Sequence, residues 1–184
     1  MKKAAVFIIL LLCVLVPATG HCVDARIDEV DVRWGHGPLT VSFRVKDAFT
    51  KDIEEAVKSG IPTSFTFLIE LDRVNSLWPD EEVGSWEFKH TVKYDTIKEE
   101  YEIRLDEAGQ ASIRTKDFGE MKRIMATGAS IAITPAHLVS GAEYEVRIKA
   151  ELHTIDLPFP LSYMFFFVKL LDFETGWYSH RFSP

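Results

Sequence analysis

The sequence predicts a mainly β protein: an antiparallel β-sandwich of immunoglobulin-like proportions with two short helices. Apolar and polar residues alternate over most of the chain after residue 25, as in strands with one buried face. Helical signals are confined to two short segments, too few for a parallel sheet with a helix between successive strands. Turn residues separate roughly eight strand segments, which leaves a partly open β-barrel as the alternative architecture.

The first residues have the layout of a secretory signal peptide. Lys2 and Lys3 come before an uninterrupted apolar run over 4–16, and small or helix-breaking residues follow at 17–20. A basic start, an apolar stretch and a small-residue cleavage zone are the three parts of such a leader. The apolar run is shorter than the ~20 residues that a membrane-spanning helix needs. We therefore expect an exported protein, either periplasmic or secreted.

Two cleavage positions fit the preference for small side chains in the cleavage zone. One cut follows Gly20 and the other follows Ala25. No repeat, low-complexity tract or linker divides the rest of the chain. The predicted organisation is therefore a signal peptide over 1–25 and a single β-rich domain over 26–184.

Cysteine usage argues against both a lipid anchor and a disulfide framework. His21 precedes Cys22 where a lipid-attachment motif has a small residue, and Thr19 stands where it has a large aliphatic residue. No cysteine occurs after Cys22. An exported domain without disulfides depends on its apolar core, and a domain of this length buries roughly 70% of the surface that its unfolded chain exposes. We expect a protein that is not lipidated.

The chain is acidic, with 21 lysines and arginines against 28 aspartates and glutamates and a formal net charge of −7. Loss of Lys2 and Lys3 with the leader makes the net charge more negative. Such a surface repels nucleic-acid phosphates and anionic lipid headgroups. This charge excludes nucleic acid as an expected partner.

The first half of the domain predicts a hairpin, a helix and a series of strands. Strands at 26–34 and 39–45 flank a turn that contains glycine and proline. A helix starts after Thr50, whose hydroxyl can cap it, and ends before Gly60, which suits the left-handed position after a helix. A polar loop is expected over 75–84. The other alternating segments predict strands at 63–74, 85–94, 101–105, 111–115, 131–133 and 144–155.

The second half predicts one more helix and an unusual C-terminal segment. The helix begins at Asp117, Glu120 completes a capping-box pattern three residues later, and Gly128 is expected to end the helix. Residues 163–171 are apolar at consecutive positions, apart from one lysine, which predicts a strand buried on both faces. The alternative is an exposed apolar patch over 157–171 that contacts a protein or a membrane surface.

Several motifs occur in an order that resembles a known bacterial family. In sequence order they are Ser59-Gly60-Ile61-Pro62, Trp78, Tyr94-Asp95, Tyr101, Leu157-Pro158-Phe159-Pro160-Leu161 and Trp177. Together they resemble the domain-of-unknown-function family numbered 4390, over the whole chain after the leader. The resemblance implies an exported bacterial protein, and it brings no activity and no catalytic residue.

No local motif assigns a catalytic residue, a cofactor site or a metal ligand. No two of the six histidines lie within four residues of one another, and no nucleophile-elbow, P-loop or dinucleotide-binding pattern occurs. The run Asp80-Glu81-Glu82 lacks the alternating spacing of a calcium loop and predicts a solvated loop. A hydrolase in which a serine and an acid meet His90, His137 or His153 only in the folded protein stays open.

The dense aromatic residues are expected mostly in the core. Trp78 is an exception, because it stands beside a proline and an acidic run in the predicted polar loop. The candidate partner-binding residues are Trp78, Phe159 and Trp177. We expect a non-enzymatic binding domain that contacts another protein of the bacterial envelope. The alternatives are a carrier with a small apolar ligand among its aromatic strands and, third, the hydrolase.

Overall fold

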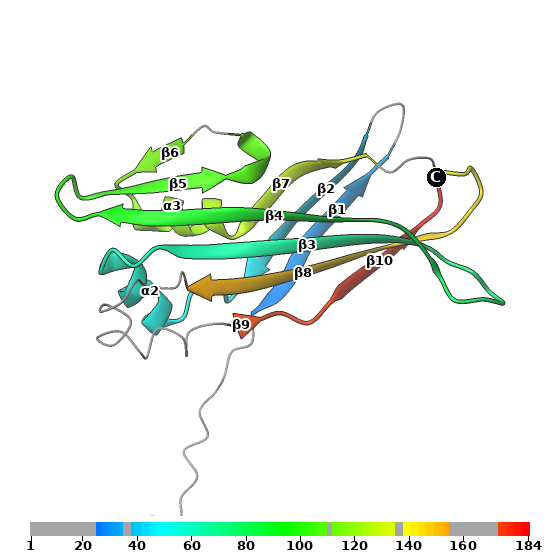
Figure 1. Ribbon diagram of the computed structural model, residues 1–184, viewed down its shortest axis with the longest axis horizontal. Coiled ribbons are helices and arrows are strands. Elements are labelled where there is room, and N and C mark those ends of the chain that lie inside the picture. Colours follow the sequence, from blue (N-terminus) through cyan, green and yellow to red (C-terminus); the bar gives the residue numbers. More distant parts are fainter. Residues whose placement is uncertain (1–24, 35–37, 110–111, 135–137, 155–172) are drawn as a thin grey trace, which may run out of the picture.

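The computed structural model describes residues 25–34, 38–109, 112–134, 138–154 and 173–184. These residues form two antiparallel sheets and two short α-helices (Figure 1). The small sheet has the strand order β1-β2-β7, and the large sheet has the order β10-β8-β3-β4-β5-β6, with β9 also paired to β8. The elements are β1 Arg26–Arg33, β2 Leu39–Lys46, α2 Lys51–Lys58, β3 Thr63–Arg73, β4 Glu81–Asp95, β5 Glu100–Leu105, the 3-10 turn η1 Asp106–Ala108, β6 Ser112–Thr115, α3 Phe118–Met125, β7 Thr127–Ile133, β8 Tyr144–Thr154, β9 Phe173–Glu174 and β10 Tyr178–Phe182.

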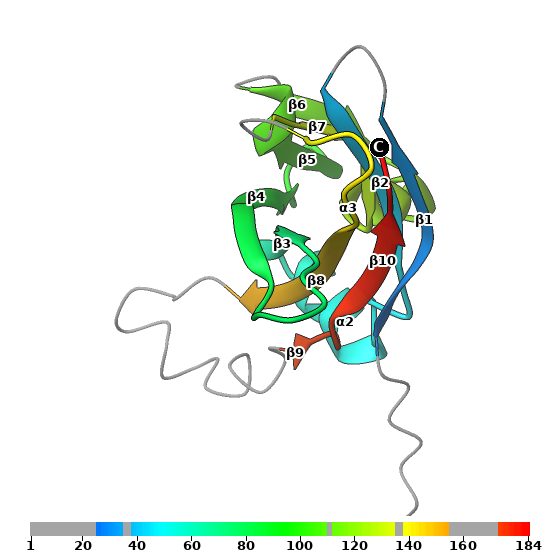
Figure 2. The same ribbon diagram turned by 90° about the vertical axis from the view of Figure 1, so that its right-hand side faces the viewer.

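The two sheets lie face to face, with β1 and β2 on one side of the molecule and β4 and β5 on the other (Figure 2). Within the described ranges no strand of the small sheet pairs with a strand of the large sheet. The predicted mainly β fold with two helices is confirmed. Of the two expected architectures, the sandwich and the partly open barrel, the structure has the sandwich.

The N-terminal hairpin forms as predicted. β1 and β2 pair in antiparallel register, from Arg26 opposite Lys46 to Arg33 opposite Thr40. Every second residue of β2, beginning with Leu39, is buried, which is the burial pattern of a strand with one face on a core.

Helix α2 follows the predicted capping chemistry. The Ile53 N–H donates to the Thr50 hydroxyl over 3.3 Å, so the side chain of Thr50 satisfies a donor that the first turn leaves free. Gly60 then takes the left-handed conformation, with φ +83°, that stops the helix. The apolar stripe of α2 is buried at Ile53, Ala56 and Val57.

The central strand β3 organises the large sheet. Ile69 lies opposite Trp86 of β4 on one side and opposite Ile148 of β8 on the other. The alternate residues Phe65, Phe67, Ile69 and Leu71 are all fully buried. β3 therefore presents one continuous apolar face to the small sheet.

Interlocking aromatic rings fill the space between the sheets. Phe43 of β2 lies with its ring centroid 5.2 Å from that of Phe67 of β3, and Phe67 lies 5.1 Å from Phe88 of β4. Gly128 of β7 makes room for Phe43, because a Cβ atom at Gly128 would lie 2.6 Å from two carbons of the Phe43 ring. The carrier hypothesis placed an apolar ligand among these aromatic strands, where the rings of the sheets already pack against one another.

Two predicted boundaries are wrong. The polar loop was expected over 75–84, but β4 begins at Glu81, because Glu81 and Glu82 continue the ladder opposite Arg73 and Asp72 of β3. The second helix was expected to run to Gly128, but α3 ends at Met125, and Gly128 lies in β7 opposite Phe43. In both places cross-strand pairing overrides the local sequence signal.

The C-terminal residues add two strands that the alternation did not predict. β9 pairs with β8 at Leu152–Phe173, and β10 pairs with β8 from Tyr178–Ile148 to Phe182–Tyr144. The segment 157–171, with Phe159 and the predicted two-face buried strand at 163–171, lies outside the described residues. Residues 1–24, which hold most of the predicted signal peptide, also lie outside them.

Candidate functional site

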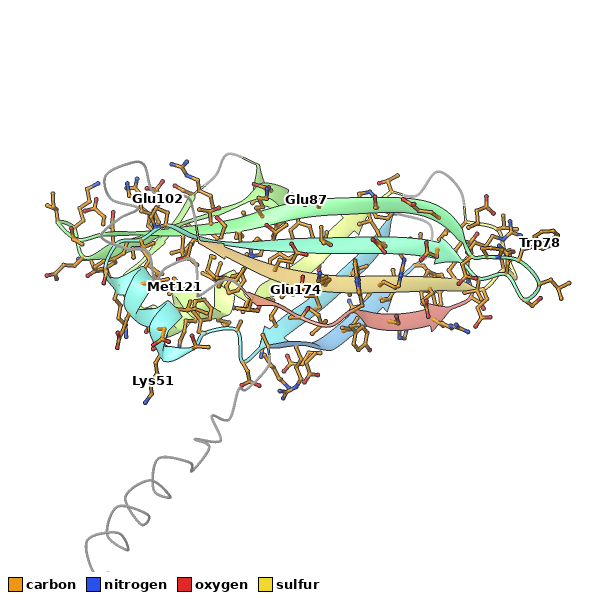
Figure 3. All side chains as sticks on the ribbon, turned by 60° about the horizontal axis from the view of Figure 1, so that its bottom comes forward. Lys51, Trp78, Glu87, Glu102, Met121 and Glu174 are labelled. Atoms are coloured by element: carbon orange, nitrogen blue, oxygen red, sulfur yellow. The ribbon has the colours of Figure 1, made fainter. Side chains whose placement is uncertain are left out.

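The connection between β3 and β4 projects from one end of the sandwich and exposes two apolar side chains. Trp78 is 79% exposed and Leu77 is 89% exposed. Trp78 lies at the opposite end of the molecule from Lys51 of α2 and Met121 of α3 (Figure 3). We call residues 74–80 the hairpin tip.

Polar contacts close the hairpin tip behind its apolar side chains. The Asn75 backbone N–H donates to Asp80 Oδ1 over 2.9 Å, and the Asn75 side-chain amide donates to the Pro79 carbonyl over 3.3 Å. The Val74 N–H donates to the Glu143 carbonyl over 2.9 Å, which joins the tip to the start of β8. These bonds hold the two ends of the loop together and join it to the residue before β8, while Trp78 faces solvent.

Two more exposed apolar residues lie at the same end of the molecule. The Trp34 ring, after β1, lies 4.9 Å from the ring of Phe182 at the end of β10, and that ring lies 5.9 Å from Tyr144 at the start of β8. The Val139 N–H donates to the Tyr144 hydroxyl over 2.8 Å. We call the four exposed apolar side chains Trp34, Leu77, Trp78 and Val139 the loop end.

Trp177, the second predicted anchor, lies elsewhere. It is 42% exposed, and it lies over two cations of β8, 5.5 Å from the Arg147 guanidinium carbon and 5.9 Å from Lys149 Nζ. The next residue, Tyr178, lies opposite Ile148 of β8, and Ile148 lies opposite Ile69 of β3. Ile69 is four residues, or about 13 Å, before the end of β3, where the hairpin tip with Trp78 begins. The structure therefore does not bring Trp177 and Trp78 into one site, and Phe159 lies outside the described residues.

A fully buried histidine, His90, pairs with the partly exposed side chain of Glu107. His90 is fully buried, with Nδ1 3.1 Å from the Met125 carbonyl oxygen and Nε2 2.7 Å from Glu107 Oε1. The Met125 carbonyl can only accept, so Nδ1 donates to it, and Nε2 shares a hydrogen bond with the Glu107 carboxyl group. Burial alone would raise the pKa of Glu107, but the hydrogen bond from His90 and its charge bring that pKa below its ordinary value.

The same geometry bears on the hydrolase hypothesis. A catalytic histidine needs one ring nitrogen free for the nucleophile while the other is held by an acid. Both nitrogens of His90 are already taken, and its ring has no exposed surface. His137 and the side chain of His153 lie outside the described residues. Among the residues that can be examined, His90 is thus a structural residue.

A groove of about 580 Å³ lies at the side of the sandwich, between the last strands of the two sheets. One wall consists of β5, η1 and β6, and the other consists of α3 and β7. The lining is mostly apolar, and Glu107, Arg123, Thr127 and Ser130 are its polar members. No pattern in the sequence indicated this groove, because its two walls come from separate sheets.

Two further findings concern the described residues only. They contain no cluster of three or more histidine, cysteine, aspartate or glutamate side chains placed to hold a metal ion. Within the same ranges, no helix has the length and apolar character needed to cross a membrane.

These features define the class of protein: a mainly β, two-sheet antiparallel sandwich with exposed apolar residues at one end and a groove between its sheet edges. The chain belongs to the family described as "Domain of unknown function (DUF4390)", whose model matches residues 23–181. This match confirms the resemblance in the motif order. Neither a curated protein nor a solved structure matches the chain.

Proposed function

We propose that this chain is an exported, non-enzymatic interaction domain that binds another protein of the bacterial envelope through the loop end, with Trp78 as the central anchor. The observation that carries the proposal is the pair Leu77 and Trp78, which are 89% and 79% exposed on a loop closed by its own hydrogen bonds. Such side chains add little to the stability of their own fold, because most of their surface stays in water.

The order of the hairpin tip supports binding. Association costs free energy for each side chain and loop that must be fixed at the interface. The bonds from Asn75 to Asp80 and Pro79 hold the tip before a partner arrives. Tryptophan is also among the residues that most often dominate the energy of an interface. A preformed loop with an outward tryptophan is therefore suited to act as an anchor.

The leader supports the location. The basic start and short apolar run are typical of a signal peptide, and the rest of the chain needs no disulfide, since an aromatic core already joins the sheets. A released domain with an exposed anchor fits a role in contacting other proteins of the compartment.

Site-specific photocrosslinking in living cells tests the proposal. A photoreactive phenylalanine analogue replaces Trp78 in one strain and Ile97 in another. Ile97 is the matched control, because it is 93% exposed and follows β4, whereas Trp78 precedes that strand. We expect one adduct of defined mass from position 78 and none from position 97, with the adduct lost when Leu77→Ser is added.

Binding of the crosslinked protein, identified by mass spectrometry and purified, gives the quantitative test. Truncation of a central anchor costs about 2 kcal/mol, or about a 30-fold rise in Kd. We expect this rise for Trp78→Ala and less than a twofold change for Ile97→Ala. Equal adducts from both positions, or an unchanged Kd for Trp78→Ala, would overturn the proposal.

A further inference from the structure

The free edges of the two sheets differ in how they are protected. Edge strands leave N–H and C=O groups unpaired, and proteins usually protect them with charged residues, prolines or short strands. β1, β6, β9 and β10 each contain at least one charged residue: Arg26, Asp28, Glu29, Asp31 and Arg33 in β1, Arg114 in β6, Glu174 in β9 and Arg181 in β10. Of the edge strands in the described ranges, β7 alone has neither a charge nor a proline.

The groove lies along this unprotected edge. Four successive residues of β7, 129–132, line it, although successive side chains of a strand point to opposite faces. The groove therefore contacts side chains on both faces of β7. The main chain of β7 lies between these two faces, so the groove also reaches the main-chain groups of this edge strand. The exposed side chains here are Ala129, Ser130 and Ala132, which are too small to shield that main chain.

The wall opposite β7 is apolar. Leu105 of β5, Ala108 of η1 and Ile113 of β6 line it, and Ile124 of α3 adds a further apolar side chain to the groove. A volume of about 580 Å³ is within the range of pockets that hold a ligand.

A bulge in β7 supports a binding role for this edge. Val41 of β2 lies opposite Ile131 and Phe43 lies opposite Gly128, so that Ser42 faces both Ala129 and Ser130. Ser130 has a φ of +51°, which is unfavourable for a residue with a side chain, and its N–H donates to the Ser42 hydroxyl over 3.0 Å. Bulges of this kind occur at sheet edges and beside functional sites.

The charge of the groove indicates the chemistry of its occupant. Within the described part of the chain, the guanidinium of Arg123 has no ion pair, whereas the neighbouring Lys122 donates to Glu54 over 2.6 Å. The one carboxylate in the lining, Glu107, already accepts from His90. The groove therefore combines apolar walls, a free strand edge and a guanidinium group, that of Arg123, which makes no ion pair within the described residues.

We propose that the groove binds an extended segment of another protein, with apolar residues at alternate positions and one acidic group, which adds a strand to the free edge of β7. The main chain of the segment pairs with residues 129–132, its apolar side chains enter between β6 and β7, and its carboxylate pairs with Arg123. Pairing of β7 with the β7 strand of a second copy of this chain is the competing outcome, and the sedimentation measurement below tests it.

The probe is the fluorescein-labelled peptide Thr-Val-Thr-Val-Thr-Val-Glu with an amidated C-terminus, titrated with the full chain as the cell processes it. Fluorescence anisotropy should show saturable binding. Ala132→Lys places a charge on the edge and should raise Kd at least about tenfold. Ser179→Lys is the matched control, because Ser179 is an exposed small residue on the edge strand β10, and its Kd should change less than twofold.

Two altered peptides separate strand addition from simple apolar binding. N-methylation at alternate residues removes main-chain donors and should abolish binding, since strand addition depends on them. Replacement of the peptide Glu by Gln should raise the Kd for the wild-type protein about tenfold. The same replacement should change the Kd for the Arg123→Gln variant less than twofold, because this variant has already lost the cation that pairs with the peptide Glu.

Several outcomes would overturn the inference. The first two are an Ala132→Lys variant that binds the peptide as tightly as wild type, and an N-methylated peptide that binds as tightly as the unmodified one. The third is displacement of the peptide by laurate, with laurate affinity changing across the variants as peptide affinity does. The fourth is a dimer in sedimentation that Ala132→Lys converts to a monomer. Trp78→Ala should leave peptide binding unchanged. The β7 proposal and the loop-end proposal can therefore fail separately.

Discussion

Truncation of Glu107 should destabilise the protein in a way that depends on pH and on the replacing residue. Glu107→Ala leaves His90 Nε2 buried without a partner, since Nδ1 remains fixed on the Met125 carbonyl. An unsatisfied buried polar group costs about 1–3 kcal/mol. In a domain of this length, 2 kcal/mol corresponds to a fall in Tm of about 4–8 °C.

Glu107→Gln is the conservative comparison. The amide can donate to Nε2 while the neutral ring donates from Nδ1 to Met125, so both nitrogens keep a partner. We expect this variant to lose less than about 1 kcal/mol. Glu102→Ala is the surface control, because the Glu102 carboxylate pairs with the exposed Arg104 over 3.1 Å, and such pairs contribute about 0–1 kcal/mol.

The pH dependence follows from the lowered pKa of Glu107. A carboxyl whose pKa is lower in the folded state than its ordinary 4.5 stabilises the fold above that ordinary value. The contribution is lost as the pH falls below 4.5 and through the folded-state pKa. Urea unfolding, followed by tryptophan fluorescence between pH 7 and pH 3, should therefore show the difference between wild type and Glu107→Ala narrowing in acid.

The reasoning about this pair would be refuted by three results. They are a loss below 0.5 kcal/mol for Glu107→Ala at pH 7, a Glu107→Gln variant as unstable as Glu107→Ala, and a difference from wild type that does not narrow as the pH falls.

Two further predictions concern packing. Gly128→Ala should lower the free energy of unfolding by about 1–3 kcal/mol, because the new Cβ would lie 2.6 Å from the Phe43 ring. Gly176→Ala is the control, since a Cβ there has no atom within 4 Å. Equal Tm values for the two variants would contradict this prediction. Trp177→Ala should cost about 0.5–1 kcal/mol through loss of its contacts with Arg147 and Lys149, and should leave the crosslink from position 78 intact; loss of that crosslink would instead make Trp177 part of the loop-end site.

Local patterns predicted most elements because their causes are local. The alternation in β2 follows directly from one buried face, and the Thr50 cap and Gly60 stop of α2 act within a few residues of the helix ends. Trp78 was singled out for the same kind of reason, since a tryptophan beside proline and acidic residues suits a solvent-exposed loop, and it is 79% exposed.

The failures occur where distant residues decide. Glu81 and Glu82 appear as loop residues in the sequence, but the ladder with β3 draws them into β4. Gly128 appears as a helix stop, but its lack of a side chain serves Phe43, a residue of another strand. The short strands β9 and β10 are defined by pairing with β8 and have too few residues for a clear alternation.

The sequence by itself determined the β class, the two helices with their capping residues, the family and one exposed tryptophan, because periodicity, caps and motif order are properties of neighbouring residues. Only the tertiary structure decided that His90 meets Glu107 and Met125, that Trp177 lies apart from Trp78, and that β6 and β7 enclose a groove. Each of these depends on how two sheets pack face to face. That packing joins residues far apart in the chain, and no local pattern specifies it.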